Sequence, residues 1–305
     1  MTIKRVEIIF NPTAGQSGRR AQDAEEMVRL LAKRDVTAEA RPTTGPSDAT
    51  KLARAAADGG ADLIVSYGGD GTLNEVLQGI VGKPVALAVW AGGTANVVAR
   101  DLRMPQTTEA LADVIAAGKT KRISLGVARR MGDADYEDGA PLQRYFFMFA
   151  GIGLDASIAR RVNPKLKRKT GKFAFWFEGF KHILTWTPEV FTVEVDGKRY
   201  DSVFALVANG KGYGGGLCMA PEADLAEPSF DVYIVPPRAS NLAYLSDLLA
   251  CARGTTARTD AKIVRAARVA ANSTVQPWVE VDGEVIGPLP MVFDVVPDAL
   301  SVIVP

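Results

Sequence analysis

The chain has 305 residues, of which 47% are hydrophobic and 23% charged; this composition excludes an intrinsically disordered chain and is typical of a soluble globular protein. Its formal net charge of +1 gives no indication of a nucleic-acid partner. Two cysteines, Cys218 and Cys251, and one histidine, His182, exclude a disulfide-rich scaffold and a zinc site built from His and Cys.

Strand and helix patterns alternate through the first domain that we expect, residues 1–122. Short apolar runs predict strands at 5–10, 37–43, 62–67 and 85–90, and amphipathic patterns predict helices at 19–35, 47–60, 73–82, 97–104 and 107–118. Strands joined by helical crossovers form a doubly wound, mostly parallel sheet, whose ligands bind beyond the carboxyl ends of the strands. Loops at 11–15, 68–72 and 92–96 follow strands in this way, which predicts a nucleotide-binding α/β domain.

The pattern changes to short strands and turns in the second domain that we expect, residues 123–305. Predicted strands lie within 121–130, 143–153, 190–200, 202–210, 230–237, 261–271, 278–287 and 291–298. They indicate a mainly antiparallel β domain, interrupted by helical insertions near 155–187 and 240–253. The sequence leaves open whether the last strand, 299–305, belongs to this domain or returns to the first.

The stretch GGDGT, residues 68–72, has the composition of a phosphate-binding loop. Glycine lets backbone N–H groups approach a phosphate closely, and a following helix adds the positive end of its dipole. Asp70 would then lie near a polyphosphate, where a carboxylate is repulsive unless Mg²⁺ intervenes. The alternative is a tight turn that caps the helix at Thr72 and leaves Asp70 exposed. No Walker motif occurs, and no G-x-G-x-x-G follows the first strand.

Six motifs occur in an order that resembles the diacylglycerol kinase catalytic superfamily, which includes bacterial lipid kinases and the sphingosine and ceramide kinases. They are NPTAG, YGGDGTLNEVLQGI, AGGTANVVAR, GIGLDASI, NGKGYGGGLCMAPEADL and VDGE. The resemblance implies a phosphofructokinase- or NAD-kinase-like first domain that binds Mg²⁺ and ATP. The implied nucleotide contacts are Asn11, Pro12, Thr13, Ala14, Gly15, Thr43, Gly68, Gly69, Asp70, Gly71, Thr72, Leu73, Asn74, Glu75, Gly93, Thr94 and Asn96.

Two departures from the family pattern concern metal binding. The structural metal loop of the family usually reads A-x-L-D-D-G-L, and ADLAEPS stands in its place here. Asp224, Glu227 and Ser229 fall at the coordinating positions. Many relatives also have an acid after G-T-x-N that joins the catalytic Mg²⁺ network, whereas this chain has Val97. The network would then depend on Asp70 together with another acid or water.

Asp-Gly turns occur in two predicted hairpins. We interpret the turn at Asp196 as structural. The second turn belongs to the DGE element of the family, which faces the cleft and supplies the base, so the resemblance implies that Asp282 or Glu284 accepts the proton of the lipid hydroxyl. The sequence does not decide between these two acids. Mg²⁺·ATP would lie between the glycine loops and the β domain.

The segment 160–184 combines a basic run with an amphipathic helix pattern. Its basic residues are Arg160, Arg161, Lys165, Lys167, Arg168, Lys169 and Lys172, and its apolar face comprises Phe173, Trp176, Phe177, Phe180, Ile183 and Leu184. This pattern suits an anionic membrane surface, and equally a helix packed in the core beside a solvated loop. Because the N-terminus lacks the apolar core of a signal peptide, we expect a cytoplasmic protein, peripheral at the inner membrane face.

These observations predict an ATP-dependent lipid kinase. Diacylglycerol, phosphatidylglycerol, sphingosine and ceramide remain open as acceptors, and a homo-oligomer remains open as well. One alternative is a soluble-substrate kinase such as NAD kinase, because GGDGT is shared with that family. The other is a lipid-binding or regulatory module without catalysis, which Val97 and the altered metal loop suggest.

Overall fold

The computed structural model describes residues 1–13, 19–131, 143–154, 156, 157, 183, 185–213, 219–252, 259–275 and 277–305. The chain divides into two compact units. Unit 1 comprises Met1–Ile123 and Asp298–Pro305, and unit 2 comprises Ser124–Pro297. Among the described residues, no helix has the length and apolar character needed to cross a membrane.

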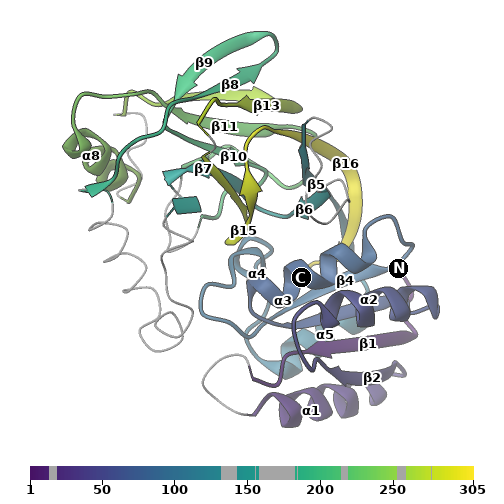
Figure 1. The fold of residues 1–305 in the computed structure, drawn as a ribbon. Coiled ribbons are helices and arrows are strands. Elements are labelled where there is room, and N and C mark those ends of the chain that lie inside the picture. The colour runs from purple at the N-terminus through teal and green to yellow at the C-terminus, as the bar shows by residue number, and fades with distance from the viewer. Residues whose placement is uncertain are drawn as a thin grey trace. The chain divides into compact units, whose positions relative to one another are not determined.

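Unit 1 contains a parallel sheet with helices packed against it (Figure 1). Its strands are β1 (Arg5–Phe10), β2 (Thr37–Pro42), β3 (Leu63–Gly68) and β4 (Ala86–Ala91), in the order β2-β1-β3-β4. Its helices are α1 (Arg20–Ala32), α2 (Asp48–Asp58), α3 (Asp70–Ile80), α4 (Val97–Asp101) and α5 (Thr108–Ala117). Strands β1, β3 and β4 are apolar and buried almost throughout, as expected where both faces of a sheet are covered.

Helix packing in unit 1 depends on small residues. Helix α1 packs against α5, and α2 packs against α3. The α2 face buries Ala49, Ala53 and Ala56, and a Cβ at Gly79 of α3 would lie 2.5 Å from the carbonyl oxygen of Thr50. Alanine and glycine therefore allow the close approach of α2 and α3, and α3 begins within the glycine loop 68–72.

Unit 2 is built from two antiparallel β-sheets. One has the order β12-β11-β10-β7-β14-β15; the other contains β13, β8 and β9 together with β5, β6 and the first part of β16. The bounds are β5 (Thr120–Arg130), β6 (Gln143–Phe146), β7 (Phe149–Gly153), β8 (Phe191–Val195), β9 (Lys198–Ser202), β10 (Phe204–Ala208), β11 (Phe230–Val235), α8 (Asn241–Ala252), β12 (Lys262–Ala266), β13 (Arg268–Asn272), β14 (Trp278–Val281), β15 (Glu284–Pro288) and β16 (Met291–Ile303).

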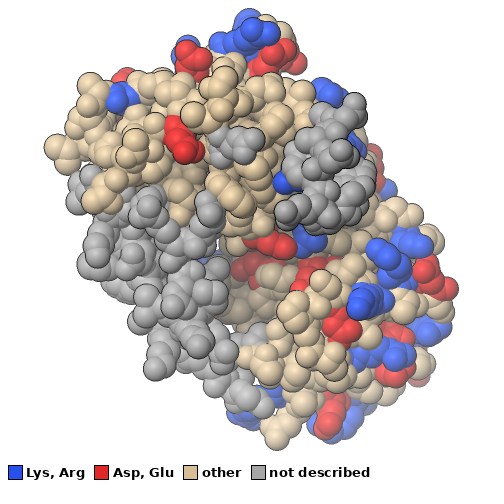
Figure 2. Space-filling view, in the orientation of Figure 1, with Lys and Arg blue, Asp and Glu red and all other residues tan. Residues whose placement is uncertain are grey.

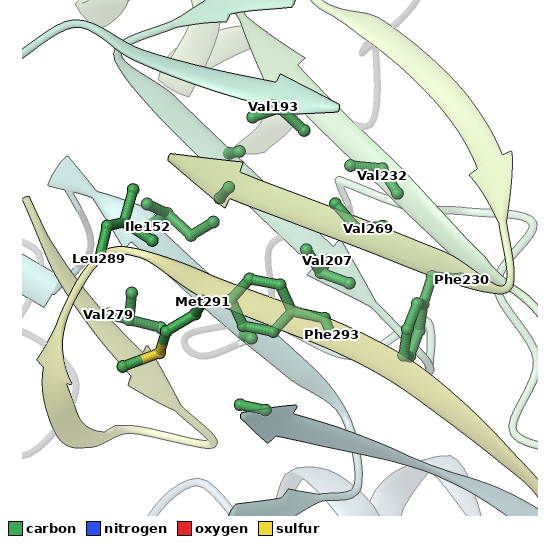
Figure 3. Close-up of a cluster of buried hydrophobic side chains, with 14 of the residues drawn as sticks. Ile152, Val193, Val207, Phe230, Val232, Val269, Val279, Leu289, Met291 and Phe293 are labelled. Atoms are coloured by element: carbon green, nitrogen blue, oxygen red, sulfur yellow. The ribbon is translucent and has the colours of Figure 1, made fainter. Parts of the chain in front are cut away.

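Alternate residues of these strands form the core of unit 2. Figure 3 shows side chains from the two sheets directed toward one another, among them Val193, Val269, Phe293, Ile152, Val207 and Val232. A period of two places every second side chain on the same face of a strand. The apolar alternation in the sequence therefore builds a two-sheet core, and the expected α/β fold class with a parallel first sheet and an antiparallel second part is confirmed.

Several element boundaries differ from those expected. The segment 261–271 is two strands rather than one, because β12 pairs with β11 and β13 pairs with β16 in the other sheet. The segment 143–153 is also two strands, separated by Phe147 and Met148. The segments 291–298 and 299–305, expected as separate strands, form the single strand β16, whose end pairs in parallel with β4 inside unit 1. Helix α3 begins at Asp70, before the expected start at residue 73.

Charged residues are distributed differently on the surfaces of the two units. Figure 2 shows basic and acidic side chains interspersed on the visible surface of unit 1. The visible surface of unit 2 is mostly uncharged, with a group of charged side chains at the tip of the β8–β9 hairpin and scattered single ones elsewhere. The described residues on this face form no large patch of a single sign.

Candidate functional site

Two glycine loops of unit 1 lie side by side at the carboxyl ends of β3 and β4. The N–H of Gly92 donates to the carbonyl oxygen of Gly68 at 2.9 Å, which extends the pairing of the two strands into the loops. A Cβ at Gly93 would lie 2.6 Å from the Cα of Gly69. Only glycine permits this approach of the two backbones, so the loops expected to bind phosphate are brought together.

Asp70 connects these two loops. One carboxylate oxygen accepts the N–H of Val97 at 2.9 Å, and the other accepts the N–H of Asn96 at 3.1 Å. Asn96 adopts a left-handed conformation and exchanges hydrogen bonds with the backbone of Gly93. The alternative of a helix capped at Thr72 with Asp70 exposed is wrong, because the helix begins at Asp70 and this side chain is half-buried.

An aromatic layer lies beneath the glycine loops. Tyr67 stacks on Trp90 with ring centroids 3.7 Å apart, and the guanidinium carbon of Arg20 lies 4.7 Å from the centre of the Tyr67 ring. The Tyr67 hydroxyl donates to Asp23 at 2.6 Å. Burial raises the pKa of Tyr67 well above its ordinary value, with the Asp23 hydrogen bond adding to the increase, and burial lowers the pKa of Arg20.

Arg20 also requires glycine at position 92, in the second glycine loop. A Cβ at Gly92 would collide with the guanidinium of Arg20, which is 3% exposed. Sequence reasoning missed Arg20, because an arginine at the start of an amphipathic helix usually indicates a solvated position. The available signal was that Arg20 begins the helix directly after the NPTAG motif.

The loop that begins at Asn11, after β1, contains a turn, and the end of β1 makes a backbone contact with Thr43. The side-chain oxygen of Asn11 accepts the N–H and the hydroxyl of Thr13, both at 3.0 Å, with Pro12 between them. The N–H of Thr43 donates to the carbonyl oxygen of Phe10 at 2.8 Å. Ala14 and Gly15, which belong to the same expected nucleotide contact, lie outside the described residues.

The remaining residues of the expected nucleotide site differ in exposure. Gly71 and Thr94 are exposed, whereas Leu73 and Asn74 are buried in α3. The carboxylate of Glu75 accepts the N–H groups of Ser47 and Ala49 at the start of α2, at 3.0 and 3.2 Å. Glu75 of α3 is therefore bonded to the start of α2, and the nucleotide contacts expected of Asn74 and Glu75 stay predictions.

The chemistry of the glycine loops fits a magnesium-bound nucleotide. Adjacent glycines let backbone groups approach phosphate oxygens, and Mg²⁺ binds preferentially to oxygen ligands. Asp70 supplies a half-buried carboxylate at the place where both loops meet. Its two backbone hydrogen bonds fix the orientation of this carboxylate, and oxygens of an ionised carboxylate can each accept more than one partner.

In unit 2, Asp282 occupies the turn between β14 and β15. Its carboxylate accepts three consecutive backbone N–H groups, those of Phe147 at 2.7 Å, Met148 at 2.9 Å and Phe149 at 3.2 Å. Its own N–H donates to the carbonyl oxygen of Phe149 at 3.1 Å. The residues between β6 and β7 and the turn at Asp282 are therefore held together in a defined geometry.

Glu284 follows Asp282 but is held less tightly. Its side chain is 51% exposed and pairs with Arg144, with 2.5 Å between the charged atoms. The turn itself is supported by Glu280, which is 1% exposed and accepts the N–H of Gly283 at 2.6 Å. The two acids named by the family pattern thus lie on one hairpin, with different degrees of constraint.

The loop expected to bind a structural metal lies before β11. The carboxylate of Asp224 accepts the N–H of Ala226 at 2.9 Å, and the carbonyl oxygen of Asp224 accepts the N–H of Glu227. Glu227 is exposed and Ser229 is half-buried. Across the described part of the chain, no group of three or more His, Cys, Asp or Glu side chains is arranged to hold a metal ion.

Some expected features lie outside the described residues. Almost all of the segment 160–184 does, including every residue of its basic run, and so do His182, Cys218 and the triple glycine 214–216. Of the apolar face in this segment, Ile183 is described and is 1% exposed.

Comparison with known proteins identifies related families along nearly the whole chain. Residues 5–128 match the model of the diacylglycerol kinase catalytic domain. Residues 149–304 match the model of the YegS C-terminal NAD kinase beta sandwich-like domain. The first match contains the loop residues around Asp70, and the second contains the hairpin with Asp282.

Individual relatives agree with these matches. The chain is 31% identical over 295 residues to a diacylglycerol kinase of Bacillus subtilis, covering 94% of this chain and 92% of that protein. It is 29% identical over 296 residues to a diacylglycerol kinase of Staphylococcus aureus, covering 95% and 89% of the two chains. A crystal structure of a diacylglycerol kinase from Bacillus anthracis is similar in fold, with a TM-score of 0.79, 24% identity, and coverage of 100% and 98%.

The resemblance noted in the sequence motifs is confirmed by these matches. Together they support a kinase that acts on a lipid. Because the Bacillus subtilis relative is 31% identical and matches almost all of the chain, the chain belongs to the diacylglycerol kinase family.

Proposed function

We propose that this protein is an ATP- and Mg²⁺-dependent kinase that transfers the γ-phosphoryl group of ATP to a lipid hydroxyl. The observation that carries the proposal is the connection of the two glycine loops by Asp70, within the domain that matches the diacylglycerol kinase model. In the reaction, the hydroxyl oxygen forms a bond to the γ-phosphorus while the bond to ADP breaks. The hydroxyl proton passes to a carboxylate.

In this proposal unit 1 binds the nucleotide. The backbones of the glycine loops bind phosphate oxygens, and Asp70 orients the metal directly or through water. When bound, Mg²⁺ neutralises the charge that develops on the phosphoryl oxygens. The aromatic layer of Tyr67 and Trp90 supports the strand ends from which both loops begin.

We assign the role of proton acceptor to Asp282, with Glu284 as the alternative. Catalysis by a general base requires a carboxylate whose position is fixed to a fraction of an ångström. Three backbone donors fix Asp282, whereas Glu284 is half exposed and held by a single ion pair. Glu284 would then orient Arg144 or the acceptor rather than receive the proton.

Diacylglycerol is the acceptor that we place first, because the named relatives are diacylglycerol kinases. A diacylglycerol molecule lies in a bilayer, so the protein would work at a membrane surface. The same proposal includes peripheral attachment through the segment 160–184 and a structural metal bound by Asp224, Glu227 and Ser229. Co-sedimentation with anionic and neutral vesicles tests the first point, and thermal stability with and without a chelator tests the second.

The experiment that tests the nucleotide half of the proposal compares two aspartates of unit 1. Asp62 accepts the N–H groups of Lys4 and Arg5, both at 2.8 Å, at the opposite end of β3 from Asp70. Asp70→Asn should lower kcat for lipid phosphorylation by about 10²–10³-fold, because a charge that acts on the transferred group is removed. Asp62→Asn should stay within about twofold of the unaltered enzyme, as expected of a surface substitution away from the site. Equal rates for Asp70→Asn and the unaltered enzyme would contradict the proposal.

A further inference from the structure

Asn209 also hydrogen-bonds to the connection between β6 and β7, which contains Phe147 and Met148. Asn209 follows β10 and is fully buried. Its side-chain amide donates to the carbonyl oxygen of Phe147 at 2.7 Å and to that of Ser124 at 3.0 Å. Its main-chain N–H and that of Gly210 both donate to the carbonyl oxygen of Met148, at 2.8 and 3.1 Å.

Asp282 and the Asn209 loop bond different backbone groups of residues 147–149. The N–H groups of Phe147, Met148 and Phe149 all donate to the carboxylate of Asp282, and the carbonyl oxygen of Phe149 accepts the N–H of Asp282. The carbonyl oxygens of Phe147 and Met148 accept from Asn209 and Gly210. Every backbone polar group of this tripeptide is therefore bonded to one of these two loops.

We propose that Asn209 is a positioning residue for the carboxylate of Asp282, acting through the 147–149 connection. The inference rests on the proposed function, in which Asp282 receives the proton of the lipid hydroxyl. Asn209 contributes no atom to the reaction. Asn209 holds the carbonyl oxygens of residues 147 and 148, and the N–H groups of residues 147–149 orient the carboxylate of Asp282. The Asn209 amide also joins this tripeptide to Ser124 in β5.

The physical reason is the cost of leaving buried carbonyl oxygens without donors. Removing the Asn209 amide leaves the carbonyl oxygens of Phe147 and Ser124 buried without this partner, so the connection moves to satisfy them. The three N–H donors move with it, because they belong to the same peptide units. A shift of about 1 Å in a catalytic group can reduce the rate by about 10²-fold.

A matched control exists in the same unit. Ser202 is fully buried, and its hydroxyl lies 2.8 Å from the carbonyl oxygen of Phe204 and 3.1 Å from that of Val235. It therefore resembles Asn209 in burial and in placing a donor beside two carbonyl oxygens, which share its single hydroxyl proton, but neither oxygen belongs to the 147–149 connection. Asn209→Ala and Ser202→Ala should both lower thermal stability, and only the first should disturb Asp282.

The test combines amide hydrogen exchange with kinetics on the full chain, using Mg²⁺·ATP and diacylglycerol in mixed micelles. In Asn209→Ala, amide exchange at Phe147, Met148 and Phe149 should accelerate about tenfold more than in the rest of the core. The reason is that local opening of this connection would no longer require breaking the hydrogen bonds of the Asn209 side chain. The kcat value should fall about 10–100-fold, while KM for ATP changes less than about twofold. Ser202→Ala should show neither change. Asn209→Ser, which keeps one donor, should be intermediate and provides a folded variant if Asn209→Ala does not fold.

Three results would overturn the inference. Exchange at residues 147–149 that rises no more in Asn209→Ala than in Ser202→Ala would remove the structural link. Unchanged kcat in Asn209→Ala and Asn209→Ser, beside a large loss in Asp282→Asn, would remove the positioning role. Absence of phosphoryl transfer by the unaltered protein would overturn the proposed function and the catalytic part of this inference, whereas the exchange result would still decide whether Asn209 fixes the connection.

Discussion

Two hairpins of unit 2 contain the same Asp-Gly turn with nearly the same backbone. In the β8–β9 hairpin, Asp196 has φ 49° and Gly197 has φ 75°; in the β14–β15 hairpin, Asp282 has φ 48° and Gly283 has φ 86°. Both are the positive-φ pairs that a two-residue hairpin turn requires. Local turn chemistry therefore explains both aspartates equally well.

The surroundings of the two turns differ completely. Asp196 is exposed at the end of its hairpin, and Lys198 after it is exposed as well. Asp282 accepts three N–H groups from residues that lie 133 to 135 positions earlier in the chain. Glu284, which corresponds to Lys198, pairs with Arg144. The comparison shows that the long-range partners of a turn, and not its own sequence, separate a structural turn from a candidate catalytic one.

The largest effect is expected from changing the two aspartates in the same way. Asp282→Asn should lower kcat about 10²–10⁴-fold, because the proposed proton acceptor is lost, and should destabilise the fold by about 1–3 kcal/mol, because its amide group faces an N–H donor. Asp196→Asn should leave kcat within about twofold and stability within about 0.5 kcal/mol. Steady-state kinetics and urea unfolding measure the two quantities. Comparable losses in both variants would show that the turns do not differ in function.

A smaller effect is expected from exchanging the residues that follow the two turns. Glu284→Lys places a cation beside Arg144 and should lower kcat about tenfold, because the guanidinium and the turn are pushed apart. Lys198→Glu changes an exposed side chain and should leave kcat unaltered. A full loss of activity in Glu284→Lys and in Glu284→Gln, together with substantial activity in Asp282→Asn, would transfer the role of base to Glu284.

The smallest effect is expected from the glycines, where the two turns should behave alike. A Cβ at Gly197 or Gly283 meets no atom within 4 Å, so the cost of alanine is the strain of a positive φ. Gly197→Ala and Gly283→Ala should each lower the free energy of unfolding by about 1 kcal/mol. Chemical denaturation checks this equality. A cost at Gly283 several times larger than at Gly197 would mean that the two backbones are not equivalent.

Local patterns in the sequence were sufficient for much of the fold. Apolar runs between helical patterns predicted the parallel sheet of unit 1, and the glycine loops were expected at the strand ends where they lie. The Asp-Gly dipeptides predicted both hairpins correctly. Each of these features depends on residues that are neighbours in the chain, which is why the sequence alone reveals them.

Features that depend on distant partners could not be predicted. The break in 261–271 arises because β12 and β13 pair in different sheets, and the stretch AKIVRAARVAA contains no glycine, proline or other turn residue that would indicate it. Asn209 stood at the end of a predicted strand, where an Asn-Gly pair indicates only a turn. Its bonds to Phe147 and Ser124 exist only after three separate segments have come together.

The central claim is that this protein phosphorylates a lipid with ATP and that Asp282 is required. The most direct measurement follows the label from γ-labelled ATP into the lipid fraction, with Mg²⁺ and diacylglycerol micelles, for the unaltered protein, Asp282→Asn and Asp196→Asn. The account predicts labelled lipid from the unaltered protein and from Asp196→Asn, with almost none from Asp282→Asn or after chelation of Mg²⁺. Equal labelling by the two variants, or no labelled lipid from any acceptor tested, would contradict it.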